Sequence, residues 1–106
     1  MIIVIVRFPV PPEMSNEAVT AAYEASAPSY QTVPGLLRKQ YLLGHVDERT
    51  RAGGAVYLWE SREAADALYT EAWRQKIAAR WGTVPHVEYF DNLLTVAPDS
   101  IVKGQL

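Results

Sequence analysis

The sequence of 106 residues has no cysteine and only two histidines, His45 and His86. Disulfide bonds, thiolate metal sites and cysteine nucleophiles are therefore excluded. A metal site would have to be built from carboxylates and two isolated histidines, which is a poor ligand set, so no metal is expected. The sequence also lacks a Ser-His-Asp order, a P-loop and an HExxH motif. Hydrolase, kinase and metalloprotease functions are left without support.

The chain also lacks a basic excess and a long apolar run. Its formal net charge of -2 counts against nucleic acid or an anionic membrane surface as a partner. No apolar stretch approaches the roughly 20 residues that cross a bilayer, and the apolar residues 1–6 are too few for a signal peptide. We therefore expect a cytoplasmic protein whose partners are small molecules or protein.

What is present is typical of one globular domain. Apolar residues make up 49% and charged residues 21% of the chain, which is close to ordinary globular usage. Pro98 follows the last apolar run and stops it. We predict a domain over residues 1–98 and a short C-terminal tail over residues 99–106.

Hydrophobic periodicity predicts four strands and two helices. The β-branched run 2–6 has no polar alternation, which is typical of a strand covered on both faces. Ser15 and Ser61 are suited to cap helices, Pro28 is expected to kink or end the first helix early, and Gly82 is a natural end for the second. The second helix either runs on through its apolar residues to Gly82 or restarts after a bend. The predicted strands are 2–6, 36–44, 52–59 and 84–96, and the predicted helices are 16–31 and 62–82.

The order strand, helix, strand, strand, helix, strand is the ferredoxin-like βαββαβ arrangement. This is an α+β fold in which two helices cover one face of a four-stranded antiparallel sheet. The other face is also apolar, because residues 2–6 are apolar on both parities and Val56 and Leu58 alternate with aromatic residues. A face of this kind is unfavourable in water, so we expect it to pack on a second copy of the chain as a homodimer.

Three segments carry a resemblance to a known family. They are residues 34–37 (PGLL), residues 52–59 (AGGAVYLW) and residues 63–69. With them the chain resembles the YdhR-type mono-oxygenase family, small dimeric α+β-barrel proteins, over nearly its whole length. The resemblance implies a barrel formed by two facing sheets and a cleft between helices and sheet in each subunit. These motifs concern shape and not catalysis.

Mono-oxygenases on this architecture commonly work without flavin, haem or metal, on phenols that ionise and pass an electron to oxygen. The resemblance therefore implies no cofactor and a cofactor-independent mono-oxygenase that acts on a small aromatic or quinone-like molecule in the helix-sheet cleft. A dimer that binds or senses a small ligand without turnover is an alternative on the same fold. A purely structural dimer is another, and its own aromatic residues would fill the cleft.

Such a site needs aromatic walls, a base and a few polar groups. His86 and Tyr23 are the predicted catalytic residues, because an imidazole is a natural base near neutral pH and Tyr23 lies on the inward stripe of its helix. A hydrogen-bonded structural histidine is the alternative for His86. Core or dimer packing is the alternative for the aromatic residues, and pairing with a carboxylate is the alternative for Arg7. The strand pattern leaves open which parity of each strand faces the cleft. The predicted pocket residues are Tyr69, Trp73, Tyr41, Tyr57, Trp81 and Arg7.

Overall fold

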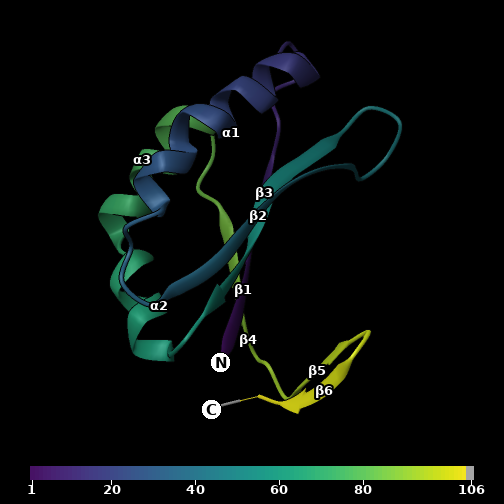
Figure 1. The fold of residues 1–106 in the computed structure, drawn as a ribbon. Coiled ribbons are helices and arrows are strands. Elements are labelled where there is room, and N and C mark those ends of the chain that lie inside the picture. The colour runs from purple at the N-terminus through teal and green to yellow at the C-terminus, as the bar shows by residue number, and fades with distance from the viewer. Residues whose placement is uncertain (105–106) are drawn as a thin grey trace.

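The computed structural model describes residues 1–104 and contains one four-stranded antiparallel sheet, with strand order β2-β3-β1-β4. Three helices lie on one face of this sheet (Figure 1). The predicted α+β, ferredoxin-like order is confirmed. The strands of the sheet are β1 (Ile2–Pro9), β2 (Leu36–His45), β3 (Arg51–Trp59) and β4 (His86–Asp91), and the helices are α1 (Asn16–Tyr30), α2 (Arg62–Leu68) and α3 (Glu71–Trp81).

Strand β1 lies at the centre of the sheet, paired with β3 on one side and β4 on the other. Its even-numbered residues, from Ile2 to Phe8, are buried, whereas Ile3 and Ile5 are only partly buried. Successive strand residues point to opposite faces, so the buried set faces the helices and the partly buried set lies on the helix-free face. Both faces of β1 are apolar, in agreement with the run of β-branched residues.

Helix caps lie where the sequence predicts them. The hydroxyl of Ser15 accepts a hydrogen bond from the Ala18 amide at 3.1 Å, and that of Ser61 accepts one from the Ala64 amide at 3.1 Å. Pro28 lies inside α1, which ends only at Tyr30. The expected early end is therefore not seen: the helix continues for two residues past Pro28, which lacks an N–H and so removes one backbone hydrogen bond.

The second predicted helix, 62–82, restarts after a bend, which is one of the two alternatives that the sequence left open. Helix α2 ends at Leu68, and Tyr69 leaves the helical region with φ -81° and ψ 52°. Thr70 then caps α3, its hydroxyl accepting a hydrogen bond from the Trp73 amide at 3.2 Å. Helix α3 ends at Gly82, which adopts the left-handed conformation at φ 96° that glycine tolerates best. The bend follows from Thr70, because threonine favours an N-cap position over the interior of a helix.

The prediction of one strand over residues 84–96 is wrong. Strand β4 ends at Asp91, and after Asn92 and Leu93 the chain forms a separate two-stranded hairpin of β5 (Leu94–Ala97) and β6 (Ser100–Lys103), which extends away from the helices (Figure 1). Pro98 and Asp99 make the turn between them, and both are favoured turn residues. The predicted tail therefore contains a strand, and residues 105–106 of it lie outside the described residues.

Glycines 53 and 54 let β1 and α1 approach β3 closely. Gly54 has a φ of 142°, and a Cβ there would lie 1.9 Å from the Val6 carbonyl oxygen. A Cβ on Gly53 would lie 2.7 Å from the Tyr23 hydroxyl and 2.8 Å from the Phe8 ring. Only glycine fits such contacts. Within residues 1–104 no helix is long and apolar enough to cross a membrane.

Candidate functional site

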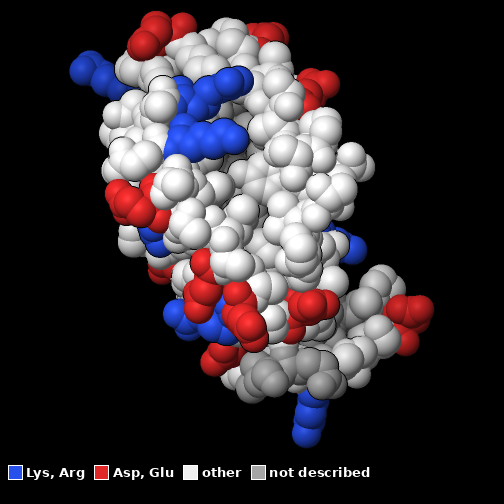
Figure 2. Space-filling model, turned by 90° about the vertical axis from the view of Figure 1, so that its left-hand side faces the viewer, with Lys and Arg blue, Asp and Glu red and all other residues white. Residues whose placement is uncertain are grey.

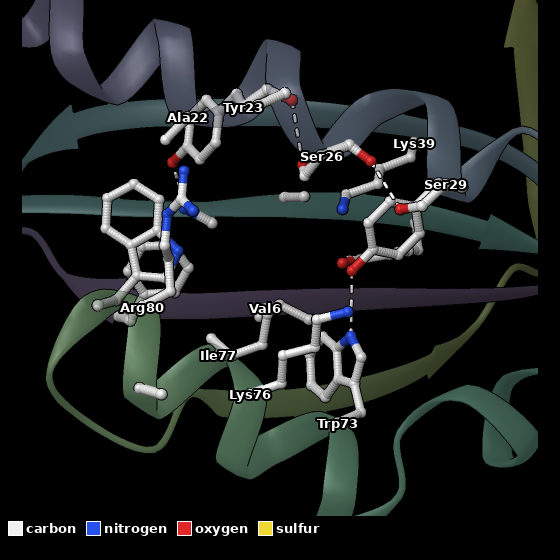
Figure 3. Close-up of a pocket in the computed structure, with 18 residues that line it drawn as sticks. Val6, Ala22, Tyr23, Ser26, Ser29, Lys39, Trp73, Lys76, Ile77 and Arg80 are labelled. Carbon is white, nitrogen blue, oxygen red and sulfur yellow. Dashed lines mark hydrogen bonds between the residues drawn. The ribbon is translucent and has the colours of Figure 1, made fainter.

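A cavity of about 610 Å³ lies between the helices and the sheet. Its walls come from α1, α3 and strands β1, β2 and β3 (Figure 3). It exists because several wall residues are small, among them Ala22, Ser26, Gly54 and Ala55. The layers are held apart by larger neighbours, so these short side chains leave a space between them. The lining comprises Val6, Phe8, Ala22, Tyr23, Ala25, Ser26, Ser29, Tyr30, Lys39, Gly54, Ala55, Tyr57, Trp73, Lys76, Ile77, Ala79, Arg80 and Trp81.

Aromatic side chains make up much of the wall. The Phe8 and Trp81 rings stack with centroids 4.7 Å apart, and Tyr23 lies 5.6 Å from Trp81. On the other side the Trp73 indole donates a hydrogen bond to the Tyr30 hydroxyl at 3.1 Å, which joins α3 to α1. Flat apolar walls with a few fixed polar groups are typical of sites for small planar ligands.

Lys39 brings an amine into this wall from β2. Its Nζ lies 3.2 Å from the centroid of the Tyr30 ring, 4.1 Å from that of Tyr41 and 4.7 Å from that of Tyr57. Register places Lys39 opposite Tyr57, so both side chains are on the helix-covered face. Among residues 1–104 no carboxylate forms an ion pair with this ammonium.

Burial lowers the pKa of Lys39 to about 7, because an ammonium loses its hydration there. The three ring faces favour the charged form and act against this loss. Without a carboxylate partner the net effect is a lysine that exchanges its proton near neutral pH. A neutral amine at a cavity wall is a competent general base or nucleophile.

The tyrosines around Lys39 remain protonated. Burial is the largest cause that raises the pKa of Tyr57 and of Tyr41. The Tyr41 hydroxyl is hydrogen-bonded to the Ser26 hydroxyl at 2.6 Å, and the Ser26 hydroxyl also lies 3.0 Å from the Tyr23 carbonyl oxygen, to which it donates. Neither phenol is therefore a base, and the Tyr41 hydroxyl already donates its hydrogen to Ser26, because the Ser26 hydroxyl donates its own to the Tyr23 carbonyl.

Both hydrogen-bonding directions of the Tyr23 hydroxyl are used by the backbone. It donates to the Leu42 carbonyl oxygen at 2.7 Å and accepts from the Gly54 amide at 2.9 Å. Burial raises the pKa of this phenol. The ring of Tyr23 lines the cavity, but its hydroxyl joins α1 to the neighbouring strands β2 and β3 at the Gly53–Gly54 close approach.

The predicted site residues separate into four groups. Tyr23, Tyr57, Trp73 and Trp81 line the cavity. Tyr41 lies beside it, against Lys39 and Ser26. Tyr69, expected in the pocket, is instead buried in the core, where its hydroxyl accepts a hydrogen bond from the Trp59 indole at 3.0 Å.

Arg7 and His86 lie on the opposite, helix-free face of the sheet. Arg7 and His86 are register partners on β1 and β4, and both contact Glu88, at 3.0 and 3.2 Å. The His86 side chain is 66% exposed. Neither residue reaches the cavity, because its strand position points away from the helices.

Lys39, the residue that sequence reasoning missed, had one available signal. It lies two residues before Tyr41 on a strand with mixed faces, so this lysine shares the face of an aromatic residue. Only the register to Tyr57 and the covering helix α1 show that this face is buried. Across residues 1–104, no group of three or more histidine, cysteine, aspartate or glutamate side chains is placed to hold a metal ion.

The four-stranded antiparallel sheet with helices on one face is a ferredoxin-like α+β fold, and a solved structure shares it. A solved structure from Caulobacter crescentus CB15, named a "putative antibiotic biosynthesis monooxygenase", matches with a TM-score of 0.50 and 22% sequence identity, over 85% of this chain and 87% of that chain. At this identity the likeness concerns the fold alone. No protein-family model matches the sequence, and no curated protein matches it.

Proposed function

We propose that this protein is a cofactor-independent mono-oxygenase that acts on a small aromatic or quinone-like molecule in the cavity. The observation that carries the proposal is Lys39, an amine without a carboxylate partner that faces a cavity of about 610 Å³ with aromatic walls. The name of the Caulobacter protein on the same fold supports mono-oxygenase chemistry. We also propose that the protein belongs to the YdhR-type family and that it is cytoplasmic.

Oxygenation without a cofactor requires a general base and a cavity that binds an aromatic ring away from water. A ring CH₂ or phenolic OH of the substrate gives its proton to the Lys39 amine, and the resulting anion passes an electron to dioxygen. Recombination forms a carbon–oxygen bond, and cleavage of the peroxide O–O bond with loss of water leaves a carbonyl. For an anthrone the balance is CH₂ + O₂ → C=O + H₂O. A positioned base of this kind typically contributes 10²- to 10⁴-fold in rate.

The remaining wall residues would bind and orient the ring. Trp73, Trp81 and Phe8 supply flat apolar surface, and the hydroxyls of Ser26 and Ser29 are polar groups at the same wall. Protonated tyrosine hydroxyls can stabilise an oxygen anion as it forms. Lys39 takes the role of base here in place of His86 and Tyr23, because His86 faces away from the cavity and both directions of the Tyr23 hydroxyl are occupied.

The open cavity favours a ligand-binding protein over a purely structural dimer, whose own side chains would fill it. A binder without turnover is the competing function. The amine with a lowered pKa distinguishes the two, because a binding site has no need of a neutral lysine.

We further propose that the protein is a homodimer that pairs through the helix-free face. Ile3, Ile5, Val56 and Leu58 form a partly exposed apolar centre there, and Phe90 beside them is 45% exposed. Burial of such a patch stabilises association. Analytical ultracentrifugation at micromolar concentration tests this proposal, and a stable monomer would contradict it.

Oxygen uptake by the purified, metal-stripped protein tests the activity, with anthrones, hydroquinones and catechols as substrates. We expect uptake above the uncatalysed rate, lost in Lys39→Met and Lys39→Arg and kept in His86→Ala. Arginine keeps the charge but does not release its proton. Thermal shifts by the same compounds without any uptake would establish a binding protein instead.

A further inference from the structure

The charged residues of the cavity wall all have one sign. Lys39, Lys76 and Arg80 line it, and the lining contains no aspartate or glutamate. The whole chain has 12 acidic and 10 basic residues, so this wall differs in sign from the rest of the molecule. A cavity lined by one sign of charge concentrates ligands of the opposite sign.

Lys76 and Arg80 lie one helical turn apart on α3. A spacing of four residues places both on the same side of the helix, here the side that faces the cavity. Within the described part of the chain neither forms an ion pair or a side-chain hydrogen bond. Their charges are therefore free to meet a ligand.

The cations are spread along the cavity. In Figure 3, Arg80 lies toward the end with Ala22 and Tyr23, and Lys39 lies toward the other end, near Ser26 and Ser29. Figure 2 shows basic side chains on the upper part of the outer surface, beside a hollow in the uncharged surface. Both α3 residues are exposed, so they stand at the mouth, whereas Lys39 lies inside against three rings.

We propose that the ligand of this cavity is an aromatic acid, whose ring lies between the aromatic walls and whose carboxylate is held at the mouth by Lys76 and Arg80. This inference rests on the proposed function and narrows its substrate class. The Arg80 guanidinium and the Lys76 ammonium, one helical turn apart on α3, are both groups that bind a carboxylate well. Holding the acid at the mouth leaves Lys39 free to take a proton from the ring substituent at the inner end.

The test compares two ligands of the same shape and different charge, without oxygen. Binding of 1-hydroxy-2-naphthoate and of 1-hydroxy-2-naphthamide is measured anaerobically by isothermal titration calorimetry. We expect the acid to bind on the order of 10-fold more tightly than the neutral amide at low salt, and this ratio to fall as salt is added. Equal affinity for the two ligands would overturn the inference.

Variants then locate the anion. Arg80→Gln and Lys76→Gln should each lower the affinity for the acid several-fold and leave the affinity for the amide unchanged. Arg74→Gln is the matched control, because it removes the same charge from the same helix at a position outside the cavity lining. A preference for the acid that survives Arg80→Gln together with Lys76→Gln would contradict the proposed carboxylate site.

The binding experiment tests the ligand class and the activity experiment tests the oxygenase, so the two proposals can be refuted independently. A preference for the acid without oxygen uptake from any substrate supports the ligand class and refutes the oxygenase. Uptake with neutral phenols and no preference for the acid supports the oxygenase and refutes the ligand class.

Discussion

The space between the helices and the sheet has two ends, one packed with large aromatic side chains and one left open by small residues. At the α2 end, Trp59 and Tyr69 are buried and pack edge to face with ring centroids 5.7 Å apart. At the α1 and α3 end, Ala22, Gly54 and Ala55 take the corresponding inner positions and leave a cavity of about 610 Å³.

The polar groups at the two ends also differ, because one has its hydrogen-bond partner within the core and the other faces the cavity. The buried Trp59 N–H is satisfied inside the core by the Tyr69 hydroxyl, so this end is closed to other partners. At the open end the Lys39 ammonium lies over the rings of Tyr30, Tyr41 and Tyr57, and among residues 1–104 it has no carboxylate partner. The comparison indicates that the packed end stabilises the fold and that the open end is shaped for a ligand.

The largest expected effect is on the packed end. Trp59→Ala should lower the free energy of unfolding by about 3–5 kcal/mol, because it removes a fully buried indole and leaves a void. Chemical denaturation measures this loss. Val46→Ala is the control, since Val46 is 69% exposed in the loop between β2 and β3, and it should change stability by less than about 0.5 kcal/mol. Equal effects of the two substitutions would break the comparison.

Lys39→Met should act in the opposite way, with a large loss of activity and no loss of stability. Oxygen uptake should fall by roughly 100- to 10,000-fold. Because the pKa of Lys39 is lowered on folding, the unfolded chain binds more protons between about pH 7 and 10.5. The stability of the wild-type protein should therefore rise with pH across this range.

The methionine variant lacks this pH dependence, so its advantage in stability over the wild type should be greatest below pH 7 and shrink toward pH 10.5. Thermal unfolding at several pH values checks the sign. The control Lys103→Met, at an exposed position on β6, should show neither change. A Lys39→Met protein that is less stable than the wild type at pH 6 would contradict the account.

Tyr69→Phe should have a smaller effect, confined to the packed end. It leaves the buried Trp59 N–H without an acceptor, at a cost of about 1–3 kcal/mol in unfolding free energy. Ligand affinity measured by calorimetry should remain that of the wild type. A change in affinity would mean that the two ends are coupled.

The smallest effect on stability is expected where a side chain grows into the cavity. Ala22→Leu fills part of the empty space, so the unfolding free energy should change by less than about 1.5 kcal/mol, while ligand affinity falls on the order of 10-fold. Ala21→Leu on the same helix is the control, because Ala21 is exposed. Unchanged affinity in Ala22→Leu would show that the ligand binds elsewhere.

The main sheet and the helix caps could be predicted because their signals are local. The β-branched run at residues 2–6, Ser15, Ser61 and Gly82 each indicate their role within a few residues. The bend at Tyr69 and the end of β4 at Asp91 were not determined by the sequence, because the apolar pattern runs on across both positions.

The candidate site could be predicted only in part. Tyr23, Trp73 and Trp81 line the cavity from the inward sides of α1 and α3, which helical periodicity indicates. Tyr57 lines it too, although the strand pattern left open which face it is on. Lys39 could not be recognised, because its burial arises from the register of β2 on β3 and from the cover of α1. Tyr69 and His86 were misplaced because the helix bend and the parity of β4 decide where they point.

The central claim is that the cavity holds a lysine that loses its proton near neutral pH. The most direct measurement is an NMR pH titration of the Lys39 side chain, with ¹³C-labelled lysine and the signal assigned by its absence in Lys39→Met. The account predicts a titration midpoint near the pKa of about 7 that burial imposes on Lys39. A midpoint at the ordinary lysine value of about 10.4 would contradict it and leave the cavity without a base.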